Sequence, residues 1–351
     1  MKNIHTHGGD VYRHPKALDF SSNCNPFGTP IGVKRAAAAA LERVCHYPDV
    51  TCDALRRALE REEQVPREQI ICGNGAADLI FGLVLARKPK KALLLAPGFA
   101  EYEQALDSVD CEKKYYYLKE EQNFVPEEGV LEAITKDLDM MFFCNPNNPT
   151  GTLCRLSYVK KIAEKCRDCG VFLVLDECFN DFIENPQDYT LKPFLRDYPH
   201  VFLLKAFTKK YAMAGLRLGY GLCASEETLE AVKQVMQPWN VSVIAQEAGV
   251  AALQEKEYAE TTIKMLRQER EFLLGHFRKL PLKLYDSRAN YIFFRGPEDL
   301  GANCLARGIY LRDCSNYEGL SQGYYRAAVR TRQENQQLIS VLYAILQKTE
   351  E

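Results

Sequence analysis

The residues best suited to chemistry lie between Lys205 and Gly221, in the stretch KAFTKKYAMAGLRLGYG. An apolar run at 201–204 precedes it and predicts a buried strand that ends there. A deprotonated lysine can form a Schiff base, and Arg217, eight residues after Lys209, can hold an anion with its planar fork of donors. Such a pair suits a phosphorylated aldehyde. The alternative, from this stretch alone, is that Lys209 and Lys210 are solvated charges after a strand.

A second candidate feature is the glycine turn at residues 73–76, which reads Gly-Asn-Gly-Ala. A predicted strand at 69–72 precedes it and a predicted helix at 77–86 follows. The free N–H groups and the dipole of a helix N-terminus favour phosphate, so Asn74, Gly75 and Ala76 form a candidate anion site. The plainer interpretation is a tight strand–helix turn without a ligand.

The elements that must position these residues alternate along the first two thirds of the chain. Apolar strands are predicted at 92–95, 114–118, 140–144 and 171–175, and helices at 33–44, 51–63, 99–106, 127–136 and 156–169. This alternation predicts an α/β fold with a mostly parallel sheet covered by helices. Ligands of such sheets bind at the carboxyl ends of the strands, where residues 73–76, 145–151, Asp176 and Lys209 all fall.

After Gly221 the pattern changes to a second, α+β unit. Helices are predicted at 226–236, across most of 242–280 and at 334–347, with short strands at 282–285, 291–295, 308–311 and 324–329. We therefore expect three parts: an irregular N-terminal arm over 1–30 that contributes to the site and the small domain, a large domain over 31–238, and a small domain over 239–351.

Composition describes an ordinary globular protein of 351 residues, with 46% hydrophobic and 26% charged residues and a net charge of −2. That charge implies no general attraction to nucleic acid or membranes. Thirteen scattered cysteines, without a signal peptide or a long apolar run, predict free thiols in the cytoplasm. The lone CxxC at 166–169 fits a helix end better than a zinc or redox site. His5 and His7 alone are poor evidence for a metal, and none is expected.

The stretch around Lys209 resembles the Schiff-base motif of fold-type-I pyridoxal-phosphate (PLP) enzymes. In that motif a Ser/Thr-Lys pair is followed by Gly-Leu-Arg-x-Gly, here Thr208-Lys209 and then residues 215–219. The spacing selects Lys209 over Lys210 as the Schiff-base lysine. The family usually has Ser or Thr three residues before the lysine, on the cofactor phosphate, whereas this chain has Ala206. Losing a hydrogen bond to a charged group costs about 1.5–3 kcal/mol, so cofactor affinity is expected to be lower.

The same resemblance implies roles for other residues. Asn148 would face the ring hydroxyl of PLP, and Asp176 would pair with its pyridine nitrogen and so maintain the ring as an electron sink. Phe99 would stack on the ring, although plain core packing explains it as well. Tyr47 would reach the cofactor phosphate of a neighbouring subunit, which implies a homodimer with shared active sites. The cofactor-binding set is completed by Asn74, Gly75, Ala76, Thr208, Lys209 and Arg217.

For the reaction, the chain is most similar to the threonine-phosphate decarboxylases of the cobalamin pathway, which are close to histidinol-phosphate aminotransferases. The similarity rests on the order of several weak motifs, at 7–9, 19–26, 99–102, 311–320 and 324–326. It implies that Arg326 and Asn23 hold the α-carboxylate of L-threonine O-3-phosphate. Arg312 and His7 would hold its phosphate, with His7 contributed either by the same chain or by the partner chain. A surface or interchain salt bridge is the alternative for the two arginines, and disorder is the alternative for His7.

Other activities remain open at this point. Serine phosphate differs from threonine phosphate by one methyl group, which a pocket discriminates by only about 1–3 kcal/mol. An aminotransferase of the histidinol-phosphate type is the alternative enzyme. Such enzymes usually carry tyrosine where this chain has Phe179. The similar decarboxylases resemble this chain in having phenylalanine at that position. A non-catalytic regulator built on the PLP fold is the weakest alternative, because Lys209, Asp176 and Asn148 are all present.

Overall fold

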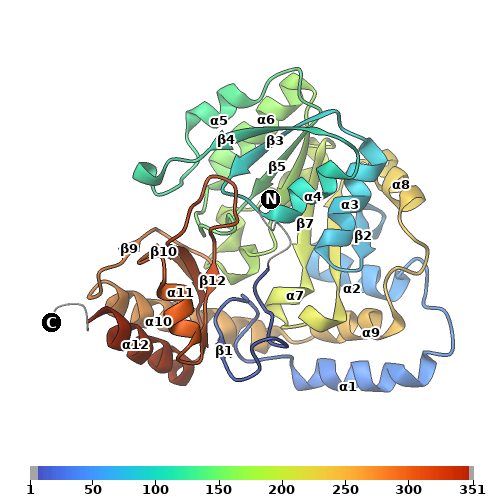
Figure 1. Cartoon of the computed structure of the whole chain (residues 1–351). Helices are drawn as coiled ribbons and strands as arrows, with labels where there is room; N and C mark the ends of the chain where they lie inside the picture. The colour runs from blue at the N-terminus through green and yellow to red at the C-terminus, as the bar shows by residue number, and fades with distance from the viewer. Residues whose placement is uncertain (1–6, 348–351) are drawn as a thin grey trace.

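A seven-stranded sheet forms the centre of the protein, for which the computed structural model describes residues 7–347 (Figure 1). β7, β6, β5, β3 and β4 are parallel, and β8 runs antiparallel to both of its neighbours, β7 and β2. The order across the sheet is β2 (Ile70–Gly73), β8 (Gly219–Cys223), β7 (Val201–Ala206), β6 (Phe172–Asp176), β5 (Met140–Cys144), β3 (Lys91–Ala96) and β4 (Glu112–Tyr117). The predicted α/β class with a mostly parallel sheet is confirmed.

Strand β8 was not expected from the sequence, because glycines at 219 and 221 weaken a strand signal. Packing explains both glycines. A Cβ at position 219 would lie 2.5 Å from the backbone nitrogen of Ala76, and one at position 221 would overlap the ring of Phe202. The glycines therefore allow β8 to pair between β7 and β2, and they bring the turn before α3 (Ala76–Arg87) against the sheet.

Helices cover both faces of this sheet (Figure 1). One face packs against α3, α4 (Ala100–Asp107) and α8 (Glu226–Val235), through side chains such as Leu83, Leu106 and Val232. The other face packs against α2 (Asp53–Glu63), α5 (Glu128–Ala133), α6 (Leu156–Cys169) and α9 (Val243–Ala252). The alanine-rich α1 (Ile31–Ala40) lies along α9. Two continuous cores therefore hold the strand ends in fixed positions.

A smaller α+β part follows the long helix α10 (Lys256–Phe277). Its antiparallel sheet has the order β12 (Arg312–Asp313), β13 (Tyr324–Ala328), β10 (Tyr291–Arg295), β9 (Lys283–Leu284), and it packs with α11 (Leu300–Leu305) and α12 (Arg332–Leu346). Helix α12 begins at a capping box formed by Thr331 and Glu334. The N-terminal arm joins this part, because β1 (Leu18–Asp19) pairs in parallel with β11 (Ile309–Tyr310).

Short helical turns complete the chain. The four-residue α7 (Phe207–Lys210) follows β7 directly. The 3-10 turns are Leu41–Arg43, Arg67–Gln69, Glu120–Gln122, Asn180–Phe182, Pro186–Asp188, Lys192–Asp197 and Ala214–Leu216.

Several further expectations bear on the kind of protein. Helix α6 ends at Cys169, and Gly170 follows with φ +76°, so the CxxC is the end of an ordinary helix. All thirteen cysteines are free. Within residues 7–347, no helix is both long and apolar enough to cross a membrane, and no cluster of three potential ligands suits a metal ion. His5 lies outside the described residues. The division of the chain at residues 30 and 238 stays a prediction.

Candidate active site

A cavity of about 250 Å³ lies where the carboxyl ends of β5, β6 and β7 meet the N-terminal arm and the small sheet. Figure 1 shows the arm running between the large sheet and the C-terminal part. Of the predicted site residues, the cavity brings together His7, Asn23, Ala76, Phe99, Asn148, Asp176, Thr208, Lys209, Arg217, Arg312 and Arg326. Residues from eight separate stretches of the chain therefore share one cavity.

Asp176 is the last residue of β6 and is almost completely buried at the cavity wall. Its Oδ2 accepts a hydrogen bond of 2.6 Å from the hydroxyl of Tyr102, and its Oδ1 accepts one of 2.9 Å from the backbone N–H of Cys178. The Tyr102 ring is itself stacked on Phe142, with 4.6 Å between centroids. Burial, with the nearby carboxylate, raises the pKa of the Tyr102 hydroxyl, which therefore stays a donor. The orientation of Asp176 is fixed.

Lys209 lies on α7, immediately beyond the end of β7, and its neighbour Thr208 is buried. Both line the cavity, as does Ala206 at the last position of the strand. Arg217 reaches the same region from a left-handed backbone conformation, with φ +57°. Gly75 has φ +88°, a backbone conformation that favours glycine, and a Cβ there would lie 2.7 Å from the Arg217 guanidinium.

Asn148 connects the large sheet with the small one. Its Oδ1 accepts a 2.5 Å hydrogen bond from Nη1 of Arg326 and a longer one, 3.3 Å, from the hydroxyl of Tyr317. Nη2 of Arg326 donates to the backbone carbonyl of Ser21, at 2.9 Å. The Nε atom of Arg326 is buried and has no hydrogen-bond partner among residues 7–347, and the same holds for Oδ1 of Asn23. Buried groups of this kind require a partner, and a ligand can supply it.

Arg312 and Arg326 lie directly opposite each other on the paired strands β12 and β13. Both are buried and both line the cavity. Arg312 donates to the backbone carbonyl of Asp313 and, at 2.8 Å, to Oδ1 of Asn316. Like charges directly opposite in a sheet are destabilising. This arrangement prepares the cavity for an anion with more than one charge.

His7 and Glu101 form the remaining wall of the cavity. His7 lines the cavity of its own chain, and its Nδ1 lies 3.7 Å from Oε1 of Glu101. Glu101 stands in the first turn of α4. Burial raises the pKa of its carboxyl group to about 7, since a hydrogen bond from its own backbone N–H and the nearby Lys209 and Arg312 offset only part of the desolvation.

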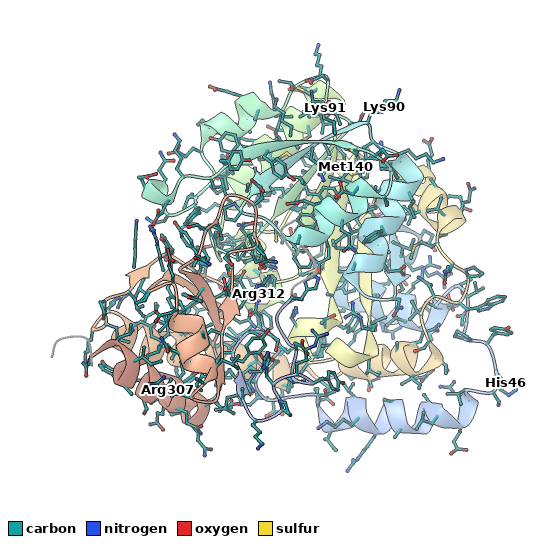
Figure 2. The ribbon with its side chains drawn as sticks, viewed as in Figure 1. His46, Lys90, Lys91, Met140, Arg307 and Arg312 are labelled. Atoms are coloured by element: carbon teal, nitrogen blue, oxygen red, sulfur yellow. The ribbon has the colours of Figure 1, made fainter. Side chains whose placement is uncertain are left out.

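Three predicted residues do not line the cavity. Asn74 is exposed, with its backbone N–H bonded to Asp78, and Gly75 stands behind the guanidinium of Arg217. Tyr47 is 79% exposed and stacks on Trp239, with 4.5 Å between ring centroids. Figure 2 shows the adjacent His46 at the far edge of the molecule from Arg312. Tyr47 therefore takes no part in the cavity of its own chain.

Other cavity residues were not singled out from the sequence as site residues. They include Glu101, Ser21, Ser22, Cys144, Cys178 and Tyr317. Several lie inside motifs that carried the family resemblance, such as 19–23 and 99–102, which was the available signal. No pattern pointed to Cys144 and Cys178, because their location follows from the pairing of β5 with β6.

Comparison with known proteins agrees with this architecture. The chain matches the family model "Aminotransferase class I and II" over residues 15–342, and it belongs to that family. It is 39% identical to the threonine-phosphate decarboxylase of Salmonella typhimurium, over 94% of this chain and 91% of the relative. It is 31% identical to histidinol-phosphate aminotransferase 1 of Cupriavidus pinatubonensis, over 93% and 87%. The crystal structure of histidinol-phosphate aminotransferase from Clostridium acetobutylicum superposes with a TM-score of 0.87 at 26% identity, covering 93% of this chain and 98% of that one.

Proposed function

We propose that this protein is a PLP-dependent carboxy-lyase. It removes the carboxyl group of L-threonine O-3-phosphate and yields (R)-1-aminopropan-2-ol O-2-phosphate. By the resemblance, that product serves cobalamin biosynthesis. The similarity to the Salmonella enzyme supports this choice, since it is higher than the similarity to the aminotransferase relatives described above.

The cavity fits PLP. Asp176 offers a fixed, buried carboxylate, which suits a protonated ring nitrogen. Ala76 and Ala77 present the N-terminus of α3 to the cavity, beside Arg217, which suits a phosphate. When bound, PLP supplies an electron sink for the electrons left on Cα after the carboxyl group departs. Asn148, with its oxygen already accepting from Arg326, has an amide group left for the ring hydroxyl.

The cross-strand pair of Arg312 and Arg326 is the observation that carries the substrate assignment. A substrate with both a carboxylate and a phosphate neutralises both guanidinium groups, and arginine binds each of these groups bidentately. Arg326 lies on the Asn148 side, its buried Nε–H donor has no hydrogen-bond partner among residues 7–347, and we assign it the α-carboxylate. Arg312 lies near Glu101 and His7, and we assign it the phosphate.

The side chain of Lys209 enters the cavity and is the group placed to hold or deliver a proton at Cα. Orientation decides which bond at Cα breaks, and Arg326 sets that orientation by holding the carboxylate. Phe179 lines the cavity without a hydroxyl group and packs edge-on against Tyr291, with 5.3 Å between centroids. By the resemblance, phenylalanine at this position is what the similar decarboxylases have.

The test is a mass analysis of products from PLP-loaded protein. Incubation with L-threonine O-3-phosphate, in the absence of any keto acid, should give a product that lacks only the carboxyl group. Serine phosphate, measured in parallel, should react by the same route with a lower kcat/KM. No reaction under these conditions, together with amine transfer from histidinol phosphate to 2-oxoglutarate, would assign the protein to the aminotransferases instead.

We also propose a cytoplasmic homodimer with shared active sites. The exposed Tyr47 lies in an apolar surface region with Leu41, Val44, Val50 and Trp239. Covering this region with a second copy would bury it and carry Tyr47 toward the partner's cofactor phosphate. A mixture of Lys209→Ala and Tyr47→Ala subunits should recover activity that neither variant has alone, because one of the two sites in a mixed dimer is intact. A monomer by light scattering would contradict the proposal.

A further inference from the structure

One wall of the cavity is formed by His7, Glu101 and Arg312, and Glu101 is the acidic side chain of this wall. Its side chain is only 18% exposed. Its Oε2 atom is fully buried and has no hydrogen-bond partner among the described residues, while Oε1 lies 3.7 Å from His7, which is beyond hydrogen-bond distance. A buried carboxyl oxygen that no described residue satisfies requires an explanation.

The groups that face Glu101 come from five elements. His7 belongs to the arm, Asp176 ends β6, Lys209 lies on α7, and Arg312 with Tyr317 belongs to the small sheet and its following loop. Lys209 and Arg312 favour the carboxylate and Asp176 opposes it, yet burial outweighs these charges. A phosphate dianion next to Arg312 would add a further negative charge at short range. The carboxylate form of Glu101 and a bound phosphate dianion therefore oppose each other.

We propose that Glu101 takes up a proton when the phosphate group of the substrate binds, and that its protonated carboxyl group donates a hydrogen bond to a phosphate oxygen. Protonation gives the unpartnered Oε2 a hydrogen bond, and it removes the repulsion between the Glu101 carboxylate and the phosphate dianion. A protonated glutamate is a donor, whereas the carboxylate is only an acceptor. This inference rests on the proposed use of the cavity for a phosphorylated amino acid.

Proton uptake makes the affinity for the phosphate group dependent on pH. Without a bound phosphate, the pKa of the Glu101 carboxyl group is raised to about 7, so this group is mostly deprotonated at pH 8. The phosphate itself, with a second pKa of about 6, is already a dianion there. Above pH 7 each added pH unit should weaken binding about tenfold relative to a variant that cannot titrate at this position.

The experiment is isothermal titration calorimetry of PLP-loaded protein with isopropyl phosphate, in two buffers of different ionisation enthalpy at pH 8. This probe has no amine and no carboxyl group, so its binding reports on the phosphate wall alone and not on the reaction. The wild-type protein should take up close to one proton more than Glu101→Gln, whose amide keeps a donor but cannot titrate. A failure of decarboxylation would leave this result unchanged, so the two proposals fail separately.

Two control variants make the result specific. Glu103→Gln removes the same charge from the same helix, outside the cavity, and should take up the same number of protons as the wild type. His7→Asn tests the neighbouring imidazole and should retain the uptake. Equal uptake in wild type and Glu101→Gln, or loss of the uptake only in His7→Asn, would overturn the proposal.

One further measurement needs no variant. An infrared difference spectrum of the wild-type protein should show a protonated-carboxyl band that appears with isopropyl phosphate, and its absence would also overturn the proposal.

Discussion

Two groups of charges flank the end of β7, and they are organised in opposite ways. Lys205 lies in a buried cluster, with its Nζ 2.9 Å from Asp181 and 3.5 Å from Glu63, while Lys192 bonds the other oxygen of Glu63 at 2.7 Å. Lys209, four residues later, enters the cavity, and no ion pair to it is found among residues 7–347. Successive residues of a strand point to opposite faces, so Lys205 and the cavity-lining Ala206 face different sides of the sheet.

The carboxyl groups in the two places differ in the same way. Burial alone would raise the pKa of Glu63, but Lys205, Lys192 and a hydrogen bond from Tyr220 outweigh it and lower the pKa to about 2. Burial raises the pKa of Glu101 to about 7. The fold neutralises the first cluster with its own side chains and leaves charges of the second to be neutralised by a ligand. We therefore assign the first cluster to stability and the second to function.

The largest effect should come from Lys209. Lys209→Ala removes the group that we propose attaches the cofactor and handles the proton at Cα, and it should abolish measurable turnover. Lys210→Ala is the matched control. Lys210 Nζ lies 4.0 Å from Glu62, at the limit of an ion pair, and its loss should leave most of the activity. Steady-state kinetics on both variants checks this, and a fully active Lys209→Ala would remove the basis of the comparison.

The second effect is on stability, at the other cluster. Glu63→Gln removes one of the two carboxylates that pair with the buried Lys205, and the partner of the half-buried Lys192, and it should destabilise the protein at pH 7 by about 3 kcal/mol. The folded-state pKa of Glu63 is lowered, so its contribution is present above pH 4.5 and is lost as the pH falls toward 2. Denaturant unfolding at several pH values, with the less buried Glu62→Gln as control, measures it.

Glu101→Gln should change stability in the opposite direction. A raised pKa means that the wild type loses stability as the pH rises from 4.5 through 7, so the variant should be more stable at pH 8 and equal at pH 4. A Glu63→Gln protein as stable as the wild type, or a destabilised Glu101→Gln at pH 8, would contradict the separation of the two clusters.

A third, smaller effect should distinguish the roles of the two arginines in the cavity. Arg326→Gln should raise the KM for L-threonine O-3-phosphate about 100-fold through loss of carboxylate binding, within the 2–5 kcal/mol expected for a buried charged partner. It should barely change the affinity for isopropyl phosphate. Arg312→Gln should weaken the binding of both ligands. Inhibition and kinetic constants for the two variants test the assignment, and the reverse pattern would exchange the two roles.

The smallest effect concerns Ala206, which lines the cavity at the last position of β7. Ala206→Ser supplies a hydroxyl at the position where the family resemblance places one on the cofactor phosphate, and it should tighten PLP binding about tenfold. Equilibrium dialysis against PLP measures the change, with Ala206→Gly as a control that adds no donor. An unchanged affinity would mean that another donor already satisfies the phosphate.

The sequence predicted the elements well where the chain has a strong local pattern. The buried runs at β5, β6 and β7 and the helix α6 were placed within two residues, because continuous apolar strands and a glycine-capped helix carry local signals. Strand β8 was missed, because its glycines are required by the Phe202 ring and the Ala76 backbone, which are distant in the chain.

The candidate site shows the same difference between local patterns and contacts of residues that are distant in the chain. Lys209, Asp176 and Asn148, which all line the cavity, could be singled out because each follows a predicted strand and stands in a recognisable motif. The pairing of Arg312 with Arg326 and the burial of Glu101 could not be predicted, since both depend on how the small sheet and the arm close over the large one. Local patterns and the family resemblance therefore located the residues proposed to hold the cofactor and the substrate, and the assembled cavity added the pairing of the two arginines and the burial of Glu101.

The most direct test of the central claim uses L-threonine O-3-phosphate labelled with carbon-13 in its carboxyl group. PLP-loaded protein, without any keto acid, is followed by carbon-13 NMR. The account predicts that the carboxylate signal disappears and that an equal amount of labelled bicarbonate appears, at a rate abolished in Lys209→Ala. A carboxylate signal that persists while the wild-type protein consumes substrate would show that a different bond at Cα is broken, and it would contradict decarboxylation.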